Sequence, residues 1–127
     1  LLEANKSEKN NFEVNNNLGT AYLMKKDYEN AVMYYKNALD IEPKDINVKN
    51  NLGNAYLKIP DYESARDVFT DLINSNKENW NAYLSLGKIY MQLGDNEKAL
   101  KNLLLLKSKK PDFKTAEVDS LIAVLQE

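Results

Sequence analysis

A set of residues that recurs every 34 positions constrains this chain more than any other feature. The dipeptide Leu-Gly occurs three times at this spacing, at Leu18-Gly19, Leu52-Gly53 and Leu86-Gly87. The residues that follow it recur in the same register: Tyr22, Tyr56 and Tyr90; Asp27, Asp61 and Asp95; Ala31, Ala65 and Ala99. A fixed period of this length is typical of repeat architectures, in which each repeat is one supersecondary unit. The sequence therefore predicts three copies of one folding unit.

Each unit is expected to be a pair of helices, because apolar residues follow the helical spacing of three and four positions. Aspartate and asparagine side chains accept hydrogen bonds from the free amides of a first helical turn, so they are suited to N-caps. We predict these caps at Asp27, Asp45, Asp61, Asn79 and Asp95. The expected helices span residues 12–25, 28–41, 46–59, 62–74, 80–93, 96–108 and 114–126.

The three glycines of the Leu-Gly pairs require a structural reason, because glycine inside a helix costs about 1 kcal/mol relative to alanine. Close approach of a second helix is the usual reason. We expect the small residue of each second helix to pack against the glycine: Ala31, Ala65 or Ala99. These recurring residues are interpreted as packing residues and not as a catalytic constellation.

The combined pattern resembles the tetratricopeptide repeat, whose members share Leu-Gly, Tyr, Ala, an aromatic residue, a second Ala and Pro. Repeat one, residues 12–45, carries Leu18, Gly19, Tyr22, Ala31, Tyr35, Ala38 and Pro43. Repeat two, residues 46–79, carries Leu52, Gly53, Tyr56, Ala65 and Phe69. Repeat three, residues 80–113, carries Trp80, Tyr83, Leu86, Gly87, Tyr90, Ala99 and Pro111.

The resemblance implies an all-α fold, a right-handed α-solenoid of three stacked helix-turn-helix repeats followed by a C-terminal capping helix at 114–127. In that helix Val118, Leu121, Ile122 and Leu125 form an apolar stripe, and we expect Glu117, Asp119 and Ser120 to face away from the core. Residues 1–11 are expected to be either the tail of a preceding repeat's helix or a flexible terminus. The chain is expected to be a fragment of a longer repeat array.

Composition removes several classes of function. The chain has no histidine and no cysteine, which excludes histidine-dependent triads, disulfides and thiolate zinc sites. A net charge of −2 does not favour a nucleic-acid partner. No apolar run approaches the roughly 20 residues that span a membrane, and no targeting segment is recognisable. We therefore expect no enzyme activity, no cofactor, no metal and no membrane insertion, and the compartment, cytoplasmic or periplasmic, stays open.

The resemblance also implies where a ligand would bind, because the first helices of such repeats line a concave groove that holds a peptide or a partner protein. The corresponding positions here are Asn17, Thr20, Asn51, Asn54, Leu57, Lys58, Leu84, Ser85 and Lys88. An asparagine amide offers donors and an acceptor together, so it can pair with a peptide backbone. Lys58 and Lys88 could attract acidic side chains or a terminal carboxylate. The alternative is that these asparagines reflect the asparagine-rich composition of the whole chain.

One subfamily of these repeats binds the C-terminal tails of heat-shock chaperones through a clamp of two lysines, an arginine and two asparagines. The corresponding positions here hold Asn16, Thr20, Asn51, Asn81 and Ser85. Only Asn51 matches the clamp and no basic residue does. The sequence therefore predicts that chaperone tails are not the ligand.

Two other functions remain open besides a protein–protein interaction scaffold. The run from Leu103 to Leu106 exceeds what one amphipathic stripe needs, so two of its leucines are expected to be exposed unless a following helix covers them. Such leucines, with the C-terminal helix, could form a homo-oligomer interface. The chain could also be the regulatory arm of a larger enzyme whose catalytic domain lies elsewhere.

Overall fold

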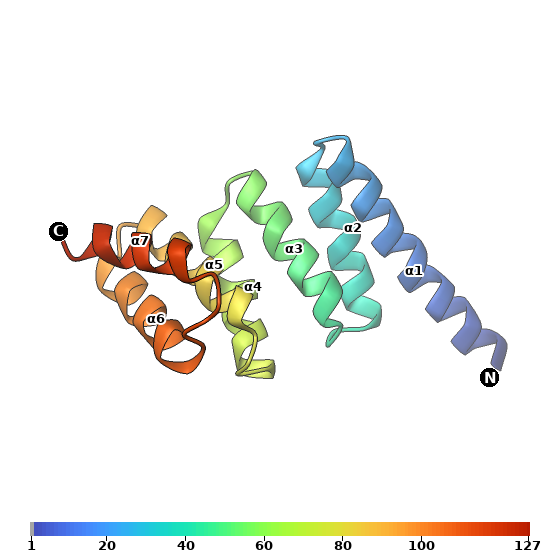
Figure 1. Cartoon of the computed structure of the whole chain (residues 1–127). Helices are drawn as coiled ribbons and strands as arrows, with labels where there is room; N and C mark the ends of the chain where they lie inside the picture. The colour runs from blue at the N-terminus through green and yellow to red at the C-terminus, as the bar shows by residue number, and fades with distance from the viewer. Residues whose placement is uncertain (1) are drawn as a thin grey trace. The chain divides into compact units, whose positions relative to one another are not determined.

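The computed structural model describes the backbone of residues 2–127 and the side chains from residue 11 onward. Within these residues every regular element is a helix (Figure 1). The helices are α1 (Leu2–Met24), α2 (Tyr28–Ile41), α3 (Ile46–Lys58), α4 (Tyr62–Ser75), α5 (Trp80–Gln92), α6 (Asn96–Lys109) and α7 (Thr115–Leu125). The predicted all-α class is confirmed, and the helix ends lie within a few residues of the predicted ones everywhere except at the start of α1.

The chain divides into two compact units, Leu1–Val68 and Phe69–Glu127, here called the N-terminal unit and the C-terminal unit. In the N-terminal unit α1 and α2 form an antiparallel hairpin, and α3 packs against α2 and touches α1 (Figure 1). In the C-terminal unit α5 and α6 form the equivalent hairpin, and α7 packs against α6. The helix α4 contains the boundary between the units.

The first helix differs from its predicted extent. We expected a helix from Phe12, preceded by a tail, but α1 is continuous from Leu2 to Met24. Residues 2–11 contain neither glycine nor proline, so nothing in the backbone forces a turn before Phe12. Leu1 lies outside the described residues. There is thus no break in the helix between residues 2–11 and the first repeat.

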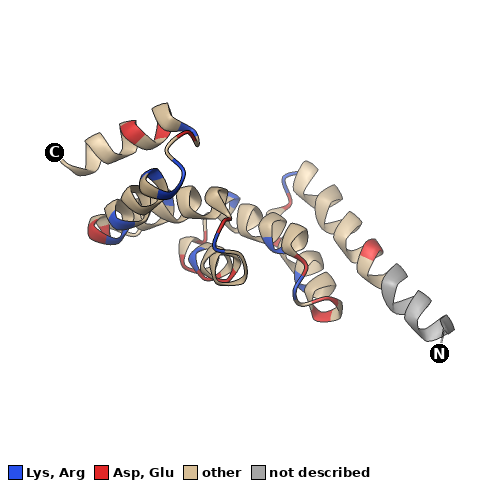
Figure 2. Cartoon of the chain, turned by 60° about the horizontal axis from the view of Figure 1, so that its bottom comes forward, with Lys and Arg blue, Asp and Glu red and all other residues tan. Residues whose placement is uncertain are grey.

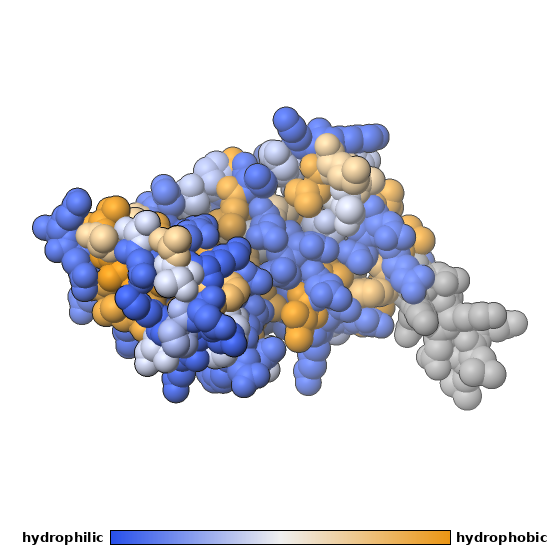
Figure 3. Space-filling view, viewed as in Figure 1, coloured by the Kyte–Doolittle hydropathy of each residue, from blue (hydrophilic) through white to orange (hydrophobic). Residues whose placement is uncertain are grey.

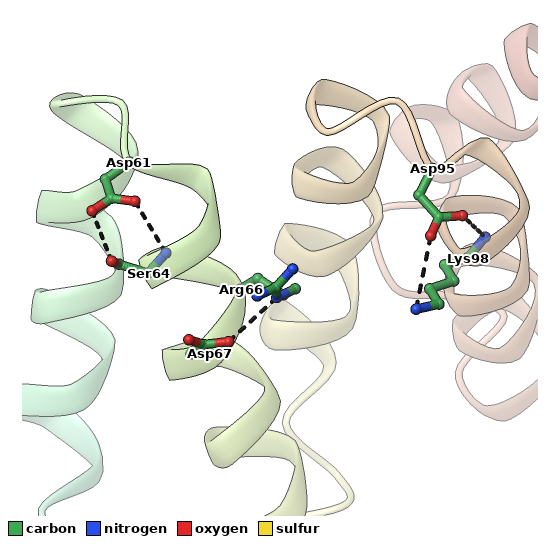
Figure 4. A network of polar contacts seen from close by, with 6 residues as sticks. All are labelled: Asp61, Ser64, Arg66, Asp67, Asp95 and Lys98. Carbon is green, nitrogen blue, oxygen red and sulfur yellow. Dashed lines mark hydrogen bonds and ion pairs between the residues drawn. The ribbon is translucent and has the colours of Figure 1, made fainter.

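The predicted N-caps are all present. Asp45 accepts a hydrogen bond from the backbone N–H of Val48 at 2.9 Å, and Asp27 and Asn79 cap α2 and α5 in the same way. Figure 4 shows Asp61 and Asp95, which each accept a bond at 3.1 Å from the backbone N–H three residues further on. Each cap satisfies one of the unpaired amides of a first turn. These local bonds fix where the helices begin.

Two of the three glycines allow a large side chain of the second helix to pack closely. A Cβ atom added to Gly19 would lie 2.7 Å from two ring atoms of Tyr35, and one added to Gly87 would lie 2.7 Å from Leu103. The nearest neighbours of these two glycines thus come from Tyr35 and Leu103. Ala31, Ala65 and Ala99 are fully buried, and their contact with the glycines stays a prediction. Because a glycine has no Cβ, the helix surface there accommodates a large facing side chain.

The leucine run of α6 divides as predicted. Leu103 and Leu106 are fully buried, whereas Leu104 and Leu105 are 43% and 39% exposed. The packing of α7 on α6 does not cover these two side chains. On the face seen in Figure 3, apolar side chains are separated by hydrophilic ones and do not join into one broad patch.

Candidate functional site

The predicted ligand positions of the first two repeats lie on α1 and α3 in the N-terminal unit. Here they are called the amide face: Asn17, Thr20, Asn51, Asn54, Leu57 and Lys58. Asn51, Asn54 and Lys58 follow one another at three- and four-residue spacing, so they share one face of α3. Asn17, Thr20, Asn54 and Lys58 are exposed, and Asn51 and Leu57 are half-buried. All six positions are thus at least partly open to solvent.

Three side-chain amides of the amide face are free to bind a ligand. Within the part of the chain that the structure describes, Asn17, Asn51 and Asn54 make no side-chain hydrogen bond. Each amide can donate two hydrogen bonds and accept others. A peptide backbone offers N–H donors and carbonyl acceptors that match these groups.

Thr20 is held differently from the asparagines. Its Oγ1 atom lies 2.9 Å from the hydroxyl oxygen of Tyr35, and either hydroxyl can be the donor. The Tyr35 side chain is fully buried, and a buried tyrosine hydroxyl needs a hydrogen-bond partner. Thr20 therefore satisfies the core of the α1–α2 hairpin, and its hydroxyl has less capacity left for a ligand.

Charge is sparse on the helices of the amide face. From residue 11 to its end, α1 carries only Glu13, and α3 carries only Lys49 and Lys58. Second helices carry more charge, which Figure 2 shows in red and blue; α4, for example, has Glu63, Arg66, Asp67 and Asp71. The amide face therefore offers hydrogen bonding with little net electrostatic attraction.

Asn16 occupies a position that the chaperone-binding subfamily uses for its clamp. Its Oδ1 atom is enclosed and has no hydrogen-bond partner in the described structure. A buried acceptor without a partner costs free energy of about 1–3 kcal/mol. Asn16 thus weakens the N-terminal unit and does not present its carbonyl oxygen to a ligand.

The predicted positions of the third repeat are less available to a ligand than those of the first two repeats. Leu84 is buried, with 3% of its surface exposed, and Ser85 is half-buried. Lys88, four residues after Leu84 on the same face of α5, forms an ion pair with Glu117 of α7. The positive charge that we expected to attract a ligand is already paired within the C-terminal unit.

The polar residues of α7 are partly exposed as predicted, with Ser120 open to solvent and the Glu117 and Asp119 side chains 41% and 46% exposed, but the two carboxylates also have partners. We expected Glu117 and Asp119 to face away from the core, but Glu117 binds Lys88, and Asp119 Oδ1 lies 2.8 Å from Lys107 Nζ. The bond from Lys88 lowers the pKa of the Glu117 carboxyl below its usual range. Hydrophobic periodicity assigned these carboxylates to solvent because it does not take account of lysines on neighbouring helices.

Two hollows at turns of the N-terminal unit do not coincide with the predicted site. A hollow of about 520 Å³ is lined by Ile41–Asp45 at the α2–α3 turn. Another, of about 250 Å³, lies at the α1–α2 turn beside Ile59. Among the described residues there is no cluster of acidic side chains that could hold a metal ion. None of the described helices combines the length and apolar character that crossing a bilayer requires.

The profile of one protein family, the CABIN1 N-terminal domain, matches residues 4–126 of this sequence. The chain belongs to the CABIN1 N-terminal domain family. The match extends over both units and includes α7, so the last helix is part of the family's domain. No curated protein matches the sequence.

Solved structures confirm the fold of this family member as a tetratricopeptide repeat fold. The tetratricopeptide domain of Arabidopsis OM64 is similar with a TM-score of 0.79 and 22% identity, over 94% of this chain and 97% of that one. The second such domain of human RPAP3, solved with the HSP70 peptide SGPTIEEVD, gives 0.80 and 19% identity, over 94% and 98%. The Yersinia enterocolitica secretion chaperone SycD, solved with a peptide of the translocator YopD, gives 0.79 and 18%, over 90% and 91%.

Proposed function

We propose that this chain is a protein-interaction module that binds an extended peptide segment on the amide face of α1 and α3. The observation that carries the proposal is the set of three free amides, those of Asn17, Asn51 and Asn54, on helices with few charges. The RPAP3 and SycD domains, which share the fold, were each solved with a peptide. Their identity to this chain is below 25%, so they support the class of ligand and not a particular sequence.

The chemistry favours recognition of the peptide main chain. An amide side chain can accept from a backbone N–H and donate to a backbone carbonyl at the same time. Such pairs read the main chain and leave the peptide's side chains free to vary. Half-buried Leu57 offers an apolar contact, and exposed Lys58 can attract a carboxylate near one end of the peptide. Chaperone tails are not the proposed ligand, because only Asn51 matches the clamp.

The proposal is tested by selecting binders from a phage-displayed library of random peptides against the whole chain. The variant with Asn17→Ala, Asn51→Ala and Asn54→Ala should bind the selected peptides roughly 30-fold more weakly, because about 2 kcal/mol of hydrogen bonding is lost. The matched control replaces three exposed asparagines outside this face: Asn37, Asn74 and Asn96. Equal affinity of the two triple variants, or failure to select any peptide, would overturn the proposal.

Self-association is the second candidate function, and the exposed leucines of α6 favour it. Leu104 and Leu105 are both partly exposed on a helix whose other two leucines are buried. We expect Leu105→Glu to abolish any concentration-dependent rise in mass measured by analytical ultracentrifugation. Lys101→Glu, on the same helix and exposed, is the matched control for the added negative charge. A mass that is constant with concentration in the unmodified chain would remove this candidate.

The remaining predictions about function stay predictions. These are the absence of catalysis within this chain, the absence of a nucleic-acid partner and the role of a regulatory arm in a larger enzyme. Full-length sequence and activity screens would test them, and none of the experiments above depends on their outcome.

A further inference from the structure

The contact of α7 with its own hairpin has the composition of a protein–protein contact. Two ion pairs fasten the helix on either side, Glu117 to Lys88 on α5 and Asp119 to Lys107 on α6. Val118 lies between the two carboxylates in the sequence and is 2% exposed, and Ile122 follows them and is 7% exposed. A short apolar anchor flanked by complementary charges is the usual anatomy of a specific helix-docking site.

The helix itself is weakly supported outside this contact. Its N-cap residue, Lys114, has φ 41° and makes no capping hydrogen bond through its side chain. Val124 is 56% exposed, and Leu121 and Leu125 are only half-buried. An isolated helix of this length is marginal in water. Its docking therefore depends on the ion pairs and the short apolar anchor.

The surface under α7 corresponds in register to part of the amide face. Lys88, which contacts α7, is two periods of 34 after Thr20 and one period after Asn54. Thr20 is exposed in the N-terminal unit, whereas Lys88 is paired with α7 in the C-terminal unit. If α7 left, Lys88 and Lys107 would lose their carboxylate partners.

We propose that the α5–α6 surface under α7 is a second binding site, specific for an acidic amphipathic helix, and that α7 is its resident occupant. The site accepts a helix in which two carboxylate residues flank a valine-sized residue. An isoleucine-sized residue follows four positions after the valine-sized one. A partner helix with this pattern replaces α7 by pairing with Lys88 and Lys107. This site is separate from the amide face, and its occupant is a helix and not an extended peptide.

A free helix can replace α7 only if it overcomes the advantage that α7 has as a tethered segment. A segment tethered by a short linker competes at an effective concentration on the order of millimolar. A free helix with the same sequence as α7 therefore binds the native chain poorly at micromolar concentration. Weakening the resident helix raises the affinity for the free helix by the factor by which the open state becomes more populated. When the weakening is made by reversing charges, the size of this gain in affinity measures how much the paired charges hold α7 on the site.

The probe is a fluorescent synthetic peptide of residues 114–127, titrated into the whole chain. We expect weak binding to the native chain and roughly tenfold tighter binding to the variant Glu117→Lys with Asp119→Lys, in which both ion pairs become repulsive. Adding Lys88→Glu and Lys107→Glu to that variant restores complementary pairs within the chain and returns the peptide to weak binding. The control, Glu78→Lys with Glu127→Lys, makes the same change of net charge at exposed positions outside the contact.

Amide hydrogen exchange shows whether the variants act by undocking. In the variant Glu117→Lys with Asp119→Lys, amide hydrogen exchange should rise in residues 115–125 and stay unchanged in α5 and α6. Unchanged peptide affinity in that variant would overturn the proposal. So would exchange that rises throughout α5 and α6, because α7 would then be an inseparable part of the unit's core. Loss of binding at the amide face has no bearing on either result.

Discussion

The first and third repeats form the same hairpin but differ on the face that points away from it. In both, a glycine of the first helix lies against a large buried residue of the second, Gly19 against Tyr35 and Gly87 against Leu103. In the N-terminal unit the Tyr35 hydroxyl also binds Thr20. In the C-terminal unit the equivalent of Thr20 is Lys88, which binds the added helix α7. The hairpin contact is thus a property of the repeat, whereas the outer face depends on what covers it.

The comparison extends to one position that is polar in the first repeat and apolar in the third. Asn16 has an enclosed oxygen without a hydrogen-bond partner, whereas its equivalent Leu84 is buried without polar cost. The turns between paired helices also differ: Lys26 adopts φ 63° where Gly94 adopts φ 80°. Left-handed backbone is unstrained for glycine but costs a side-chain-bearing residue about 1 kcal/mol. The first repeat thus carries two local costs at positions where the equivalent residues of the third repeat, Leu84 and Gly94, carry none.

The largest expected effect comes from filling the glycine contact. Gly19→Ala should lower the free energy of unfolding by about 2 kcal/mol, although alanine is the better helix former, because the added Cβ would overlap the buried ring of Tyr35. Gly87→Ala should cost about 1 kcal/mol, since the Leu103 side chain can change rotamer more readily than a packed ring can move. Urea unfolding measures both. A stabilising Gly19→Ala would show that the hairpin packing is looser than described.

A smaller effect of opposite sign is expected at Asn16. Asn16→Leu should raise the free energy of unfolding by about 1 kcal/mol, because it removes an unpaired acceptor and introduces the residue type that Leu84 already buries. The matched control is Asn17→Leu, which places the same side chain one residue away at an exposed position and should be close to neutral. Equal effects at the two positions would contradict the described enclosure of the Asn16 oxygen.

The turn comparison predicts a gain of roughly 0.5 kcal/mol for Lys26→Gly. Relief of the left-handed strain is partly offset by the greater freedom of glycine in the unfolded chain. The control is Lys25→Gly: Lys25 precedes the left-handed position, so this change brings no relief of strain and should not stabilise the chain. Thermal unfolding monitored by circular dichroism would separate the two variants, and stabilisation by both would remove the strain argument.

The smallest expected effect is a difference in acid sensitivity between two carboxylates. Bonds from Ser64 lower the pKa of Asp61, which caps α4, and the bond from Lys88 lowers the pKa of Glu117. A lowered folded-state pKa gives stability that is present above the unfolded pKa of about 4 and is lost as the pH falls through the folded value. Lys88→Met should remove the share due to Glu117 and leave that of Asp61. Unfolding measured from about pH 6 down to about pH 3 checks this, and an unchanged pH dependence in Lys88→Met would contradict the Lys88–Glu117 contribution.

Sequence by itself determined the repeat period, the class of fold, the caps and most helix ends, because these depend on residues a few positions apart. Asp45 and Asp61 are caps whatever lies elsewhere in the chain. The division of the leucine run, with Leu103 and Leu106 inside, follows from helical periodicity alone.

Only the tertiary structure decided which side chains meet across helices. It placed Tyr35 against Gly19, paired Glu117 with Lys88, and so engaged one of the third repeat's predicted ligand residues with α7. Periodicity assigns a residue to a side of its own helix but contains no information about how a neighbouring helix is rotated or shifted. The availability of a predicted binding residue, free at Asn51 and engaged at Lys88, depends on that neighbour.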